Sequence, residues 1–353
     1  MNLDALPVAL TYDDVLLVPQ RSRIRSRSQV TVASRLTNTI DLATPVLAAN
    51  MDTVCGWEMA ATMTELGGVG IIHRFLPIDG QAAEVRKAFE ASDGGVIGAA
   101  VGTDHDLVAR TRACAEAGAR VVVLDIAHGH AEHAIEGIKR LKQECPEVQI
   151  IAGNVATAEG AVDLAKVGAD AIKVGVGPGG VCTTRLVAGV GVPQLTAVSE
   201  AANSGCGVPI IADGGVRASG DIAKALAVGA DSVMIGSMFA GTKEAPGEVE
   251  QTERGLFKRV RGMASKEAAQ LRAERAGEEL DDEYFEHRAA EGVEGLVPYR
   301  GSVVLLVNEL MAGLKSSMSY SNAADLTEFR ERARMVRVTG AGLHENHPHA
   351  THH

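Results

Sequence analysis

A lone cysteine lies near the end of a glycine-rich segment, "VGVGPGGVCTTR", which runs from Val174 to Arg185. Its four glycines are Gly175, Gly177, Gly179 and Gly180. Glycine lets the backbone turn sharply and approach a ligand or an ion, because no Cβ covers the amides and carbonyls. Thr183 and Thr184 beside Cys182 would make a poor apolar core. We therefore interpret this cysteine as a nucleophile whose thiolate needs stabilisation by nearby amides or positive charge.

Two later segments have the composition of a phosphate-binding site. They are "IADGG", from Ile211 to Gly215, and "MIGS", from Met234 to Ser237. Glycine amides there could donate to an oxyanion, and Ser237 adds a hydroxyl. Asp213 suits a ribose diol, although a helix cap or an Asx turn would also explain it. The "GxGxxG" spacing within "GVGPGG" does not by itself indicate a dinucleotide-binding fold, since no strand–helix–strand unit with a downstream acidic residue surrounds it.

The elements that must position these residues are eight short apolar runs. They begin at Pro45 (PVLAAN), Gly68 (GVGIIH), Val96 (VIGAAV), Val121 (VVVLDI), Gln149 (QIIAGN), Ala171 (AIKVGV), Pro209 (PIIADG) and Ser232 (SVMIGS). The runs are nearly continuous in hydrophobicity, as strands covered on both faces are, and each precedes an Ala-rich stretch of helical character. We therefore expect a buried, parallel sheet.

Three joins between a helix and the next strand are alike: "AGARVVVLD", "VGADAIKVG" and "VGADSVMIG". Their glycine suits the left-handed cap that ends a helix, so a helix-then-strand unit repeats. Eight such units predict one (β/α)8 TIM barrel over residues 1–353, with a doubly wound open sheet as the alternative. In a barrel, the C-terminal strand ends line the active site. The residues expected there are Asn50, Met51, His73, Asp125, Asn154, the 175–184 loop, Asp213, Gly214, Gly215, Gly236 and Ser237.

Composition argues against several classes of protein. The 353-residue chain has neither an apolar run long enough for a membrane helix nor a signal-peptide pattern, so we expect a cytoplasmic protein with no membrane partner. Its formal charge of -11 opposes binding to nucleic acid. The five cysteines are widely spaced and include no CxxC pair, which favours reduced thiols. Cys114, Cys145 and Cys206 are interpreted as small buried apolar residues.

Two segments depart from the barrel pattern. Residues 264–300 are highly charged and broken by glycines, and we expect a flap-like excursion there, with a solvated helix as the alternative for its Glu- and Arg-rich half. Residues 338–353 form a polar tail with five histidines, whose spacing favours a solvated segment over a metal site. A metal-dependent barrel hydrolase is also disfavoured, because only His73, His128 and His130 lie near strand ends.

Five motifs together resemble the IMP dehydrogenase and GMP reductase family over nearly the whole chain. They are "LTYDDVLLVP", "GNVATAEGA", "VGVGPGGVCTTRLVAGVGVPQL", "IIADGGVR" and "VEGLVPYRG". The resemblance implies a (β/α)8 barrel, a homotetramer, a purine 5′-monophosphate substrate and a nicotinamide cofactor, NADPH or NAD(H). It further implies that Cys182 attacks C2 of the purine ring to give a covalent thioimidate, while the glycine-rich loop folds around the nucleotide and a potassium ion.

The resemblance also implies roles for further residues. Thr184 and Glu291 would handle a proton, and Tyr284 on the flap would activate water. The implied substrate contacts are Met51, Asp213, Gly214, Gly215, Gly236, Ser237, Gly262 and Met263. The implied cofactor contacts are Asp125, Asn154 and Gly175. The implied potassium ligands are Gly177, Gly179 and Cys182, completed by Glu345, Asn346 and His347 of a neighbouring subunit.

The motifs favour reduction of GMP to IMP and ammonia over oxidation of IMP to XMP. Dehydrogenases activate water with an Arg-Tyr pair, but "DEYFEH" places Glu283 beside Tyr284, and a carboxylate cannot replace a guanidinium in stabilising a phenolate. "AANMDTVCGWEMA", "HRAAEG" and "GLKSSMSY" are similar to reductases, and no paired CBS domain is inserted. "LVAGVGVPQ", "EGVEGLVPYRG" and "GAGLHENHPH" are more like dehydrogenases, so an IMP dehydrogenase stays as the alternative.

Two departures from the family pattern concern the phosphate. Family members usually have serine at the position of Gly180 and tyrosine at that of Val260, and both side chains touch the nucleotide phosphate. We therefore expect a weaker or shifted phosphate site. An inactive purine nucleotide-binding homologue is a remote alternative, against which the cysteine and its proton-handling pair argue.

Overall fold

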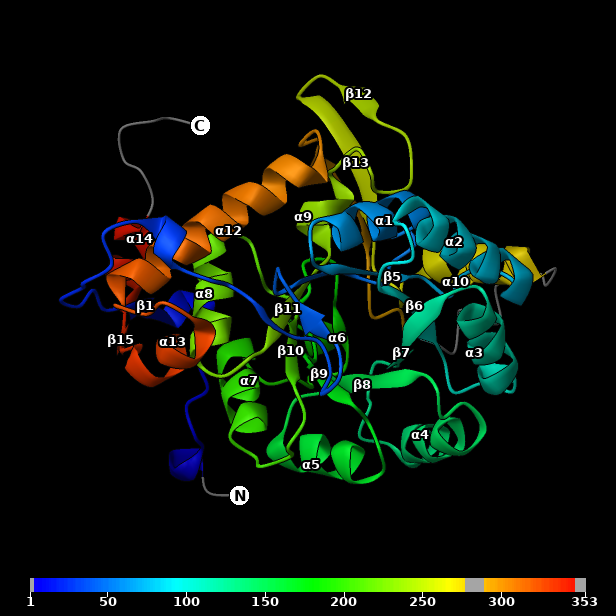
Figure 1. Ribbon diagram of the computed structural model, residues 1–353, viewed down its shortest axis with the longest axis horizontal. Helices are drawn as coiled ribbons and strands as arrows, with labels where there is room; N and C mark the ends of the chain where they lie inside the picture. Colours follow the sequence, from blue (N-terminus) through cyan, green and yellow to red (C-terminus); the bar gives the residue numbers. More distant parts are fainter. Residues whose placement is uncertain (1–2, 277–288, 347–353) are drawn as a thin grey trace.

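A computed structural model describes residues 3–276 and 289–346 (Figure 1). Within them, eight parallel strands close into a barrel in chain order, because β11 pairs with β4. The strands are β4 (Val46–Ala48), β5 (Val69–Ile72), β6 (Ile97–Val101), β7 (Ala119–Asp125), β8 (Gln149–Val155), β9 (Ala171–Val174), β10 (Ile210–Asp213) and β11 (Ser232–Ile235). Each overlaps one of the eight predicted apolar runs. The predicted (β/α)8 barrel is confirmed, and the sheet is closed rather than open.

Helices cover the outside of the barrel. They are α1 (Trp57–Glu65), α2 (Ile78–Ala91), α3 (Leu107–Glu116), α4 (Glu132–Glu144), α5 (Ala158–Lys166), α7 (Gln194–Ala202), α8 (Ser219–Ala227) and α12 (Val303–Tyr320). Two short helices, α6 (Thr184–Val187) and α9 (Ser237–Ala240), follow strand ends. Because α12 packs against both α8 and α1, it completes the ring although other elements separate it from β11 in the sequence (Figure 1).

The burial of side chains explains why these segments form a barrel with an outer ring. Every residue of β5, β6, β9 and β11 is buried, as continuous apolar runs between a barrel interior and a helix layer must be. Helix α4 buries only one stripe, made of Ala134, Gly137, Ile138 and Leu141. That spacing of three and four residues turns one face of a helix toward the sheet.

Smaller elements surround the barrel. The 3-10 turns η1 (Leu3–Ala5), η2 (Tyr12–Asp14) and η3 (Arg27–Gln29) belong to the N-terminal segment. Strand β1 (Val15–Leu17) pairs with β15 (Met335–Arg337), and β2 (Ser34–Arg35) pairs with β3 (Asp41–Leu42). Strands β12 (Glu250–Thr252), β13 (Gly255–Arg261) and β14 (Glu294–Pro298) form an antiparallel sheet, of which β12 and β13 project at the top of Figure 1. The remaining helices are α10 (Lys266–Ala276), α13 (Leu326–Arg332) and α14 (Gly340–Glu345).

The two segments that depart from the barrel pattern are partly ordered. The predicted 264–300 excursion contains helix α10 and strand β14, while residues 277–288 lie outside the described part of the chain. The predicted polar tail begins with α14, where the side chain of Thr339 accepts a hydrogen bond from the amide of Gly342. That helix buries none of its residues against the rest of this chain.

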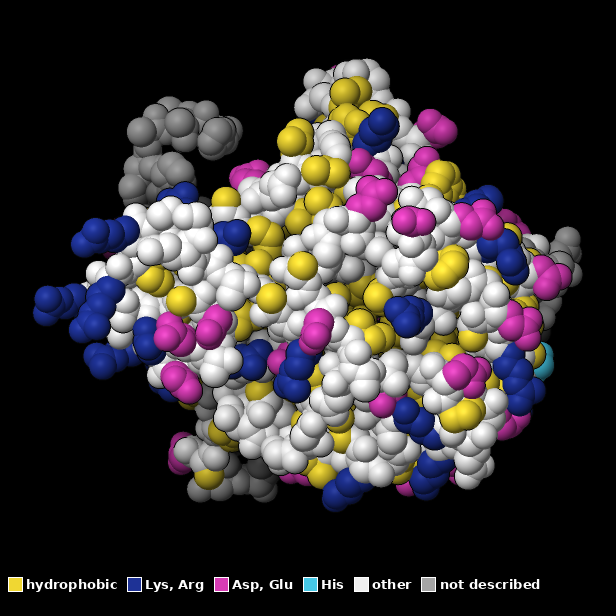
Figure 2. All heavy atoms as spheres, in the orientation of Figure 1, with side chains coloured by type: hydrophobic (Ala, Val, Ile, Leu, Met, Phe, Trp, Pro, Cys, Tyr) yellow, Lys and Arg dark blue, Asp and Glu magenta, His cyan; other side chains and the backbone are white. Residues whose placement is uncertain are grey.

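The surface mixes both signs of charge. Figure 2 shows acidic and basic side chains interspersed over most of one face, with Lys and Arg gathered at its left edge. In residues 3–276 and 289–346, no helix has the length and apolar character needed to cross a membrane.

Glycine permits close packing between β5 and α1. A Cβ built at Gly70 would lie 2.4 Å from the Cα and 2.9 Å from the Cβ of Ala60, which belong to the helix itself. In contrast, a Cβ at Gly220 in α8 would meet no atom within 4 Å. The two positions therefore make a matched pair for testing the packing of the barrel.

We predict that Gly70→Ala lowers the free energy of unfolding by about 1–3 kcal/mol, because the new methyl group pushes α1 away from the barrel. Gly220→Ala should raise it by about 0.5 kcal/mol, since alanine favours the helical backbone. Thermal unfolding followed by circular dichroism measures both shifts. An unchanged midpoint for Gly70→Ala would contradict the close packing of β5 on α1.

Candidate active site

Two adjoining cavities lie at the C-terminal ends of the barrel strands. The first has a volume of about 510 Å³ and Cys182 in its wall, and the second has a volume of about 450 Å³. Met51 and Asp213 line both cavities, so the two spaces share a wall. This end of the barrel is where (β/α)8 proteins bind their ligands.

The sequence-predicted site residues divide between the two cavities. The first is lined by Asp125, Asn154, Gly175, Gly177, Gly179, Cys182, Thr184, Gly262, Met263 and Glu291. The second is lined by Gly177, Gly179, Gly214, Gly215, Gly236 and Ser237. Glu345 and Asn346 line neither cavity. Tyr284 and His347 lie outside the described residues.

His73 does not contribute to the site, contrary to the expectation from its place at the end of β5. It lines neither cavity, and only 6% of it is exposed. Its Nδ1 accepts a hydrogen bond from the amide of Phe75 over 3.2 Å. The imidazole therefore serves the turn that follows its own strand.

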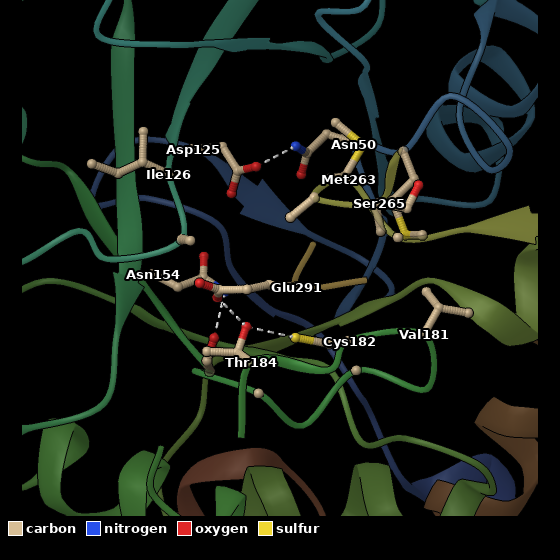
Figure 3. Close-up of a pocket in the computed structure, with 18 of the residues that line it drawn as sticks. Asn50, Asp125, Ile126, Asn154, Val181, Cys182, Thr184, Met263, Ser265 and Glu291 are labelled. Atoms are coloured by element: carbon tan, nitrogen blue, oxygen red, sulfur yellow. Dashed lines mark hydrogen bonds between the residues drawn. The ribbon is translucent and has the colours of Figure 1, made fainter. Parts of the chain in front are cut away.

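Cys182, Thr184 and Glu291 form one chain of polar contacts (Figure 3). The Sγ of Cys182 lies 3.2 Å from the Oγ1 of Thr184, and that hydroxyl donates to the Oε2 of Glu291 over 2.8 Å. A hydroxyl has one proton, so while Thr184 donates to the carboxylate it can only accept from the thiol. The chain can thus move a proton between the sulfur and the carboxylate.

This series of polar contacts joins two segments that are far apart in the sequence. Thr184 and Glu291 are separated by 107 positions. The amide of Thr183 donates to the carbonyl of Glu291 over 3.0 Å, and Cys182 faces Gly292 in an isolated antiparallel bridge. Backbone pairing therefore fixes the carboxylate beside the hydroxyl, rather than leaving it on a free loop.

The glycines of the Cys182 loop are required first by the protein's own packing. Gly175 and Gly177 have φ of +153° and +85°, which side chains rarely adopt. A Cβ at Gly175 would lie 2.1 Å from the carbonyl oxygen of Asp213, and a Cβ at Gly177 would lie 2.5 Å from the Cγ of Arg185. Strand β9 can therefore turn immediately into the loop that presents Cys182.

Cys182 differs from the other cysteines in its surroundings. Cys114 and Cys145 are buried, as predicted, whereas Cys206 is only half-buried. Burial raises the pKa of the Cys114 thiol to about 12, so that thiol stays protonated. Cys182 is half-buried and lines the first cavity, where a ligand can reach it.

A buried lysine connects the walls of the first cavity. The Nζ of Lys173, on β9, lies 2.6 Å from the Oδ1 of Asp125 on β7 and 2.7 Å from the Oδ2 of Asp213 on β10. Its side chain is only 2% exposed. Lys173 also donates to the Oδ1 of Asn154 on β8, and Asn50 donates to the Oδ2 of Asp125 over 2.9 Å (Figure 3). One ammonium group therefore contacts polar groups from three other strands.

Burial and ion pairing shift the pKa values of Asp125 and Lys173 in opposite directions. Burial alone would raise the pKa of Asp125, but the neighbouring Lys173 ammonium outweighs it and holds that pKa below its ordinary value. Burial would likewise lower the pKa of Lys173, but Asp125 and Asp213 hold it above its ordinary value. Both partners are thus charged at neutral pH.

Lys173 is a site residue that the sequence analysis missed. The signal was present: it is the only charged residue in the run "AIKVGV", which otherwise has the continuous apolar character of a buried strand. A lysine in such a strand must have carboxylate partners, since an unpaired buried charge is very costly. Aspartates end two of the other predicted runs.

The carboxylate and amide at the base of the cavity have different freedom to bind a ligand. Among the described residues, the Asp213 side chain accepts from Lys173 and from Asn154, both at Oδ2, so Oδ1 can accept from a ligand. Asn154 donates to Asp213 and to the carbonyl of Gly175, and accepts from Lys173. Asn154 therefore lines the cavity as predicted, but its amide is occupied by the protein.

We predict that Lys173→Met lowers the free energy of unfolding near neutral pH by about 3 kcal/mol, because two carboxylates that are only 18% and 19% exposed lose their cation. Asp125 has a lowered pKa in the folded protein, so its favourable contribution is present above the unfolded pKa of about 4 and lost as pH falls. Without Lys173, burial raises the pKa of Asp125. As pH falls, that carboxylate is therefore protonated, and the variant no longer carries the cost of an unpaired buried charge. The stability gap to the unmodified protein should therefore narrow as pH falls toward about 4.

Lys258→Met is the matched control for this prediction. Lys258 is equally buried, but it donates to the carbonyls of Thr242 and Ala245 and forms no ion pair within the described residues. Its removal should cost stability by an amount that changes little over the same pH range. Urea titrations at several pH values measure both gaps. A pH-independent gap for Lys173→Met would contradict the paired-charge account.

Comparisons with known proteins show which family has this barrel and this site. The sequence profile of the IMP dehydrogenase / GMP reductase domain matches residues 9–349. The chain is 36% identical to a GMP reductase from Leishmania donovani, covering 99% of this chain and 98% of the relative. It is 39% identical to an inosine-5′-monophosphate dehydrogenase from Cryptosporidium parvum, covering 96% and 94%. Both activities therefore occur among relatives at similar identity.

A solved structure gives the same result for the fold. It is the crystal structure of a variant of GMP reductase from Trypanosoma brucei in complex with guanosine 5′-monophosphate. Its TM-score with this chain is 0.92 at 35% identity, and 99% of each chain is covered. The chain therefore belongs to the IMP dehydrogenase / GMP reductase family and is an NAD(P)-dependent oxidoreductase of purine metabolism.

Proposed function

We propose that this protein is a GMP reductase, which converts GMP, NADPH and two protons to IMP, an ammonium ion and NADP+. The observation that carries the proposal is the chain from Cys182 through Thr184 to Glu291, because it places a proton donor beside the nucleophile. Loss of an amino group needs that proton, whereas it needs no activated water. The similarity to a GMP reductase with bound GMP supports the same choice.

In the first step, one bond forms at C2 of the guanine ring and another bond at C2 breaks. The Cys182 thiolate adds to C2 and forms a C–S bond. The bond from C2 to the exocyclic amine then breaks, and the amine takes a proton and leaves as ammonia. Glu291 supplies that proton through the hydroxyl of Thr184, which donates to the amine and is reprotonated from the carboxyl group. The product of this step is a thioimidate on Cys182.

The second step reduces the thioimidate and frees the product. NADPH, when bound in the first cavity, would supply the hydride that C2 receives. The C–S bond then breaks, and its electron pair returns to the sulfur of Cys182, so the thiolate is ready for the next substrate. Glu291 regains its proton from solvent at the open side of the first cavity.

The nucleotide and the cofactor would occupy the two cavities. In the second cavity, Gly214, Gly215, Gly236 and Ser237 surround the space for the phosphate, while Asp213 offers Oδ1 to the ribose and Met51 contacts the base. The first cavity has space for the nicotinamide nucleotide between apolar and polar walls. Its apolar walls are Phe75, Ile126 and Met263, and Asp125 supplies a carboxylate.

A potassium ion fits the donor atoms of the Cys182 loop. Backbone carbonyls are suitable ligands for potassium, and the loop offers those of Gly177, Gly179 and Cys182. The carbonyl of Gly179 accepts from the amide of Cys182 over 3.1 Å and keeps a second lone pair. We propose that Glu345, Asn346 and His347 of another copy complete the site in a homotetramer. A bound ion would hold the loop in the conformation that presents the thiolate.

IMP dehydrogenase is the second candidate function. Relatives with that activity are 36% to 39% identical to this chain. The reaction would use the same thioimidate but needs a water molecule activated by the flap. Against it stands Glu283, which occupies the place of the arginine beside Tyr284 in the sequence.

The decisive assay follows the absorbance of the reduced nicotinamide in both directions. We predict loss of that signal with GMP and NADPH, with release of ammonia, and no gain with IMP, NAD+ and potassium. Cys182→Ala should abolish the reaction, because no other group can form the thioimidate. Formation of XMP from IMP, with no reaction of GMP, would show that the protein is an IMP dehydrogenase and would contradict the reductase proposal.

Substitutions at Thr184 test the proton path. Thr184→Val keeps the shape of the side chain but removes the hydroxyl that joins Cys182 to Glu291, and we predict that kcat with GMP falls by about 100- to 1,000-fold. Thr184→Ser keeps the hydroxyl and should stay within about 10-fold of the unmodified enzyme. Equal effects of the two substitutions on kcat would exclude this hydroxyl from the proton path.

A further inference from the structure

The second cavity has more positive than negative charge left after its side chains are paired. Three arginines line it, Arg185, Arg217 and Arg300, together with two aspartates, Asp13 and Asp213. Arg217 forms an ion pair with Asp13, and Asp213 is paired with Lys173 behind the wall. Arg185 and Arg300 are left without a carboxylate partner in the described part of the chain. Two guanidinium groups without a carboxylate partner therefore face this cavity, whereas Asp213 shares the single cation Lys173 with Asp125.

Arg185 and Arg300 differ in what holds them. The Nε of Arg185 donates to the carbonyl of Val176 over 3.2 Å, and one terminal nitrogen donates to the carbonyl of Val192 over 2.7 Å. These hydrogen bonds stabilise the conformation of the Cys182 loop. The guanidinium of Arg300 has no hydrogen-bond partner among the described residues, although it lines the cavity and is exposed. Its donors are available to a ligand.

The backbone of Arg300 is firmly placed even though its side chain is free. Its amide donates to the carbonyl of Gly241 over 2.8 Å, and Gly301 pairs with Thr242 in an isolated parallel bridge. The carbonyl of Gly301 also accepts from the amide of Lys243 over 2.8 Å. These hydrogen bonds attach the backbone of Arg300 to the loop after α9. Helix α9 begins at Ser237, which lines the same cavity.

Other positions around this cavity cannot supply the charge. Gly180 lines it without a side chain, and a Cβ there would lie 3.1 Å from the Oγ of Ser237. Val260 is apolar, only 2% exposed, and lines neither cavity. The glycine amides and the hydroxyl of Ser237 carry no net charge. Among the three arginines that line this cavity, Arg300 is the one whose guanidinium makes no hydrogen bond to the described residues, so all of its donors can face a doubly negative group.

We infer that Arg300 binds the 5′-phosphate of the nucleotide and makes the enzyme select nucleotides over nucleosides. A phosphate monoester carries a charge of about -1.5 to -2 at neutral pH, which matches the two unpaired guanidinium groups. The planar guanidinium can donate two parallel hydrogen bonds to phosphate oxygens, which a lysine cannot do. The inference deepens the proposed function, because it names the residue that recognises one end of the substrate.

Calorimetric titration of Arg300→Met with GMP, guanosine and ribose 5-phosphate tests this inference. We expect the Kd for GMP and for ribose 5-phosphate to rise about 10- to 100-fold, because a charged pair of hydrogen bonds is lost. The Kd for guanosine should not change. In turnover, KM for GMP should rise while kcat stays nearly constant, since the phosphate is remote from C2.

Two further variants separate this role from general effects of charge or folding. Arg300→Lys keeps the charge but not the paired donors, and should bind GMP with an intermediate Kd. Arg254→Met removes an exposed arginine from the turn between β12 and β13, which lines neither cavity, and should bind GMP like the unmodified protein. Equal losses of GMP and guanosine affinity in Arg300→Met, or no loss of GMP affinity, would overturn the inference.

The same titrations distinguish failure of this inference from failure of the proposed reaction. If the unmodified protein binds GMP, IMP or ribose 5-phosphate through Arg300 but does not reduce GMP, the reductase proposal fails and the inference about Arg300 stands. If GMP is reduced and Arg300→Met has an unchanged KM, the reductase stands and the inference fails. Absence of binding of any of these phosphate esters to the unmodified protein overturns both.

Discussion

The buried ammonium of Lys173 is the interaction on which the arrangement of the site depends. It lies between Asp125 and Asp213, and it also donates to Asn154, so β9 is connected to β7, β10 and β8 by a single group. Separating any of these strands would expose an unpaired charge to a low-dielectric interior, which is costly. The Cys182 loop begins directly after β9, so its starting point is held by the same lysine. The position of the nucleophile is therefore a consequence of a charge cluster beneath it.

A second constraint is the pairing of the Cys182 loop with the segment that carries Glu291. The bridge between Cys182 and Gly292 places the carboxylate of Glu291 beside the hydroxyl of Thr184. The same backbone pairing therefore positions both the nucleophile and its proton path. Most of the polar atoms at the base of the first cavity are already satisfied by the protein. Within the described residues, the Oδ1 of Asp213 and the guanidinium of Arg300 have no protein partner, and the sulfur of Cys182 contacts only Thr184, so these groups remain for a ligand.

The barrel, and many of the residues that line its two cavities, could be predicted from the sequence, because continuous apolar runs and strand-end polar residues have direct physical causes. The role of Lys173 was missed since one charge in an apolar run gives no information on which distant carboxylates pair with it. The sheet of β12 to β14 was missed because Lys258 occupies an inward position of β13 and hides the alternation of polar and apolar residues. His73 was placed in the site wrongly, because position at a strand end does not determine which way a ring turns. Long-range backbone pairing, as between Cys182 and Gly292, leaves no local pattern.

In the proposed reaction, Cys182 forms a covalent bond to C2 of GMP as ammonia leaves. Mass spectrometry of the protein mixed with GMP and NADP+, which cannot deliver a hydride, tests it most directly. We predict a mass gain equal to GMP less ammonia, located on the peptide that contains Cys182 and absent from Cys182→Ala. No adduct from GMP, with the same adduct formed instead from IMP and NAD+, would contradict it.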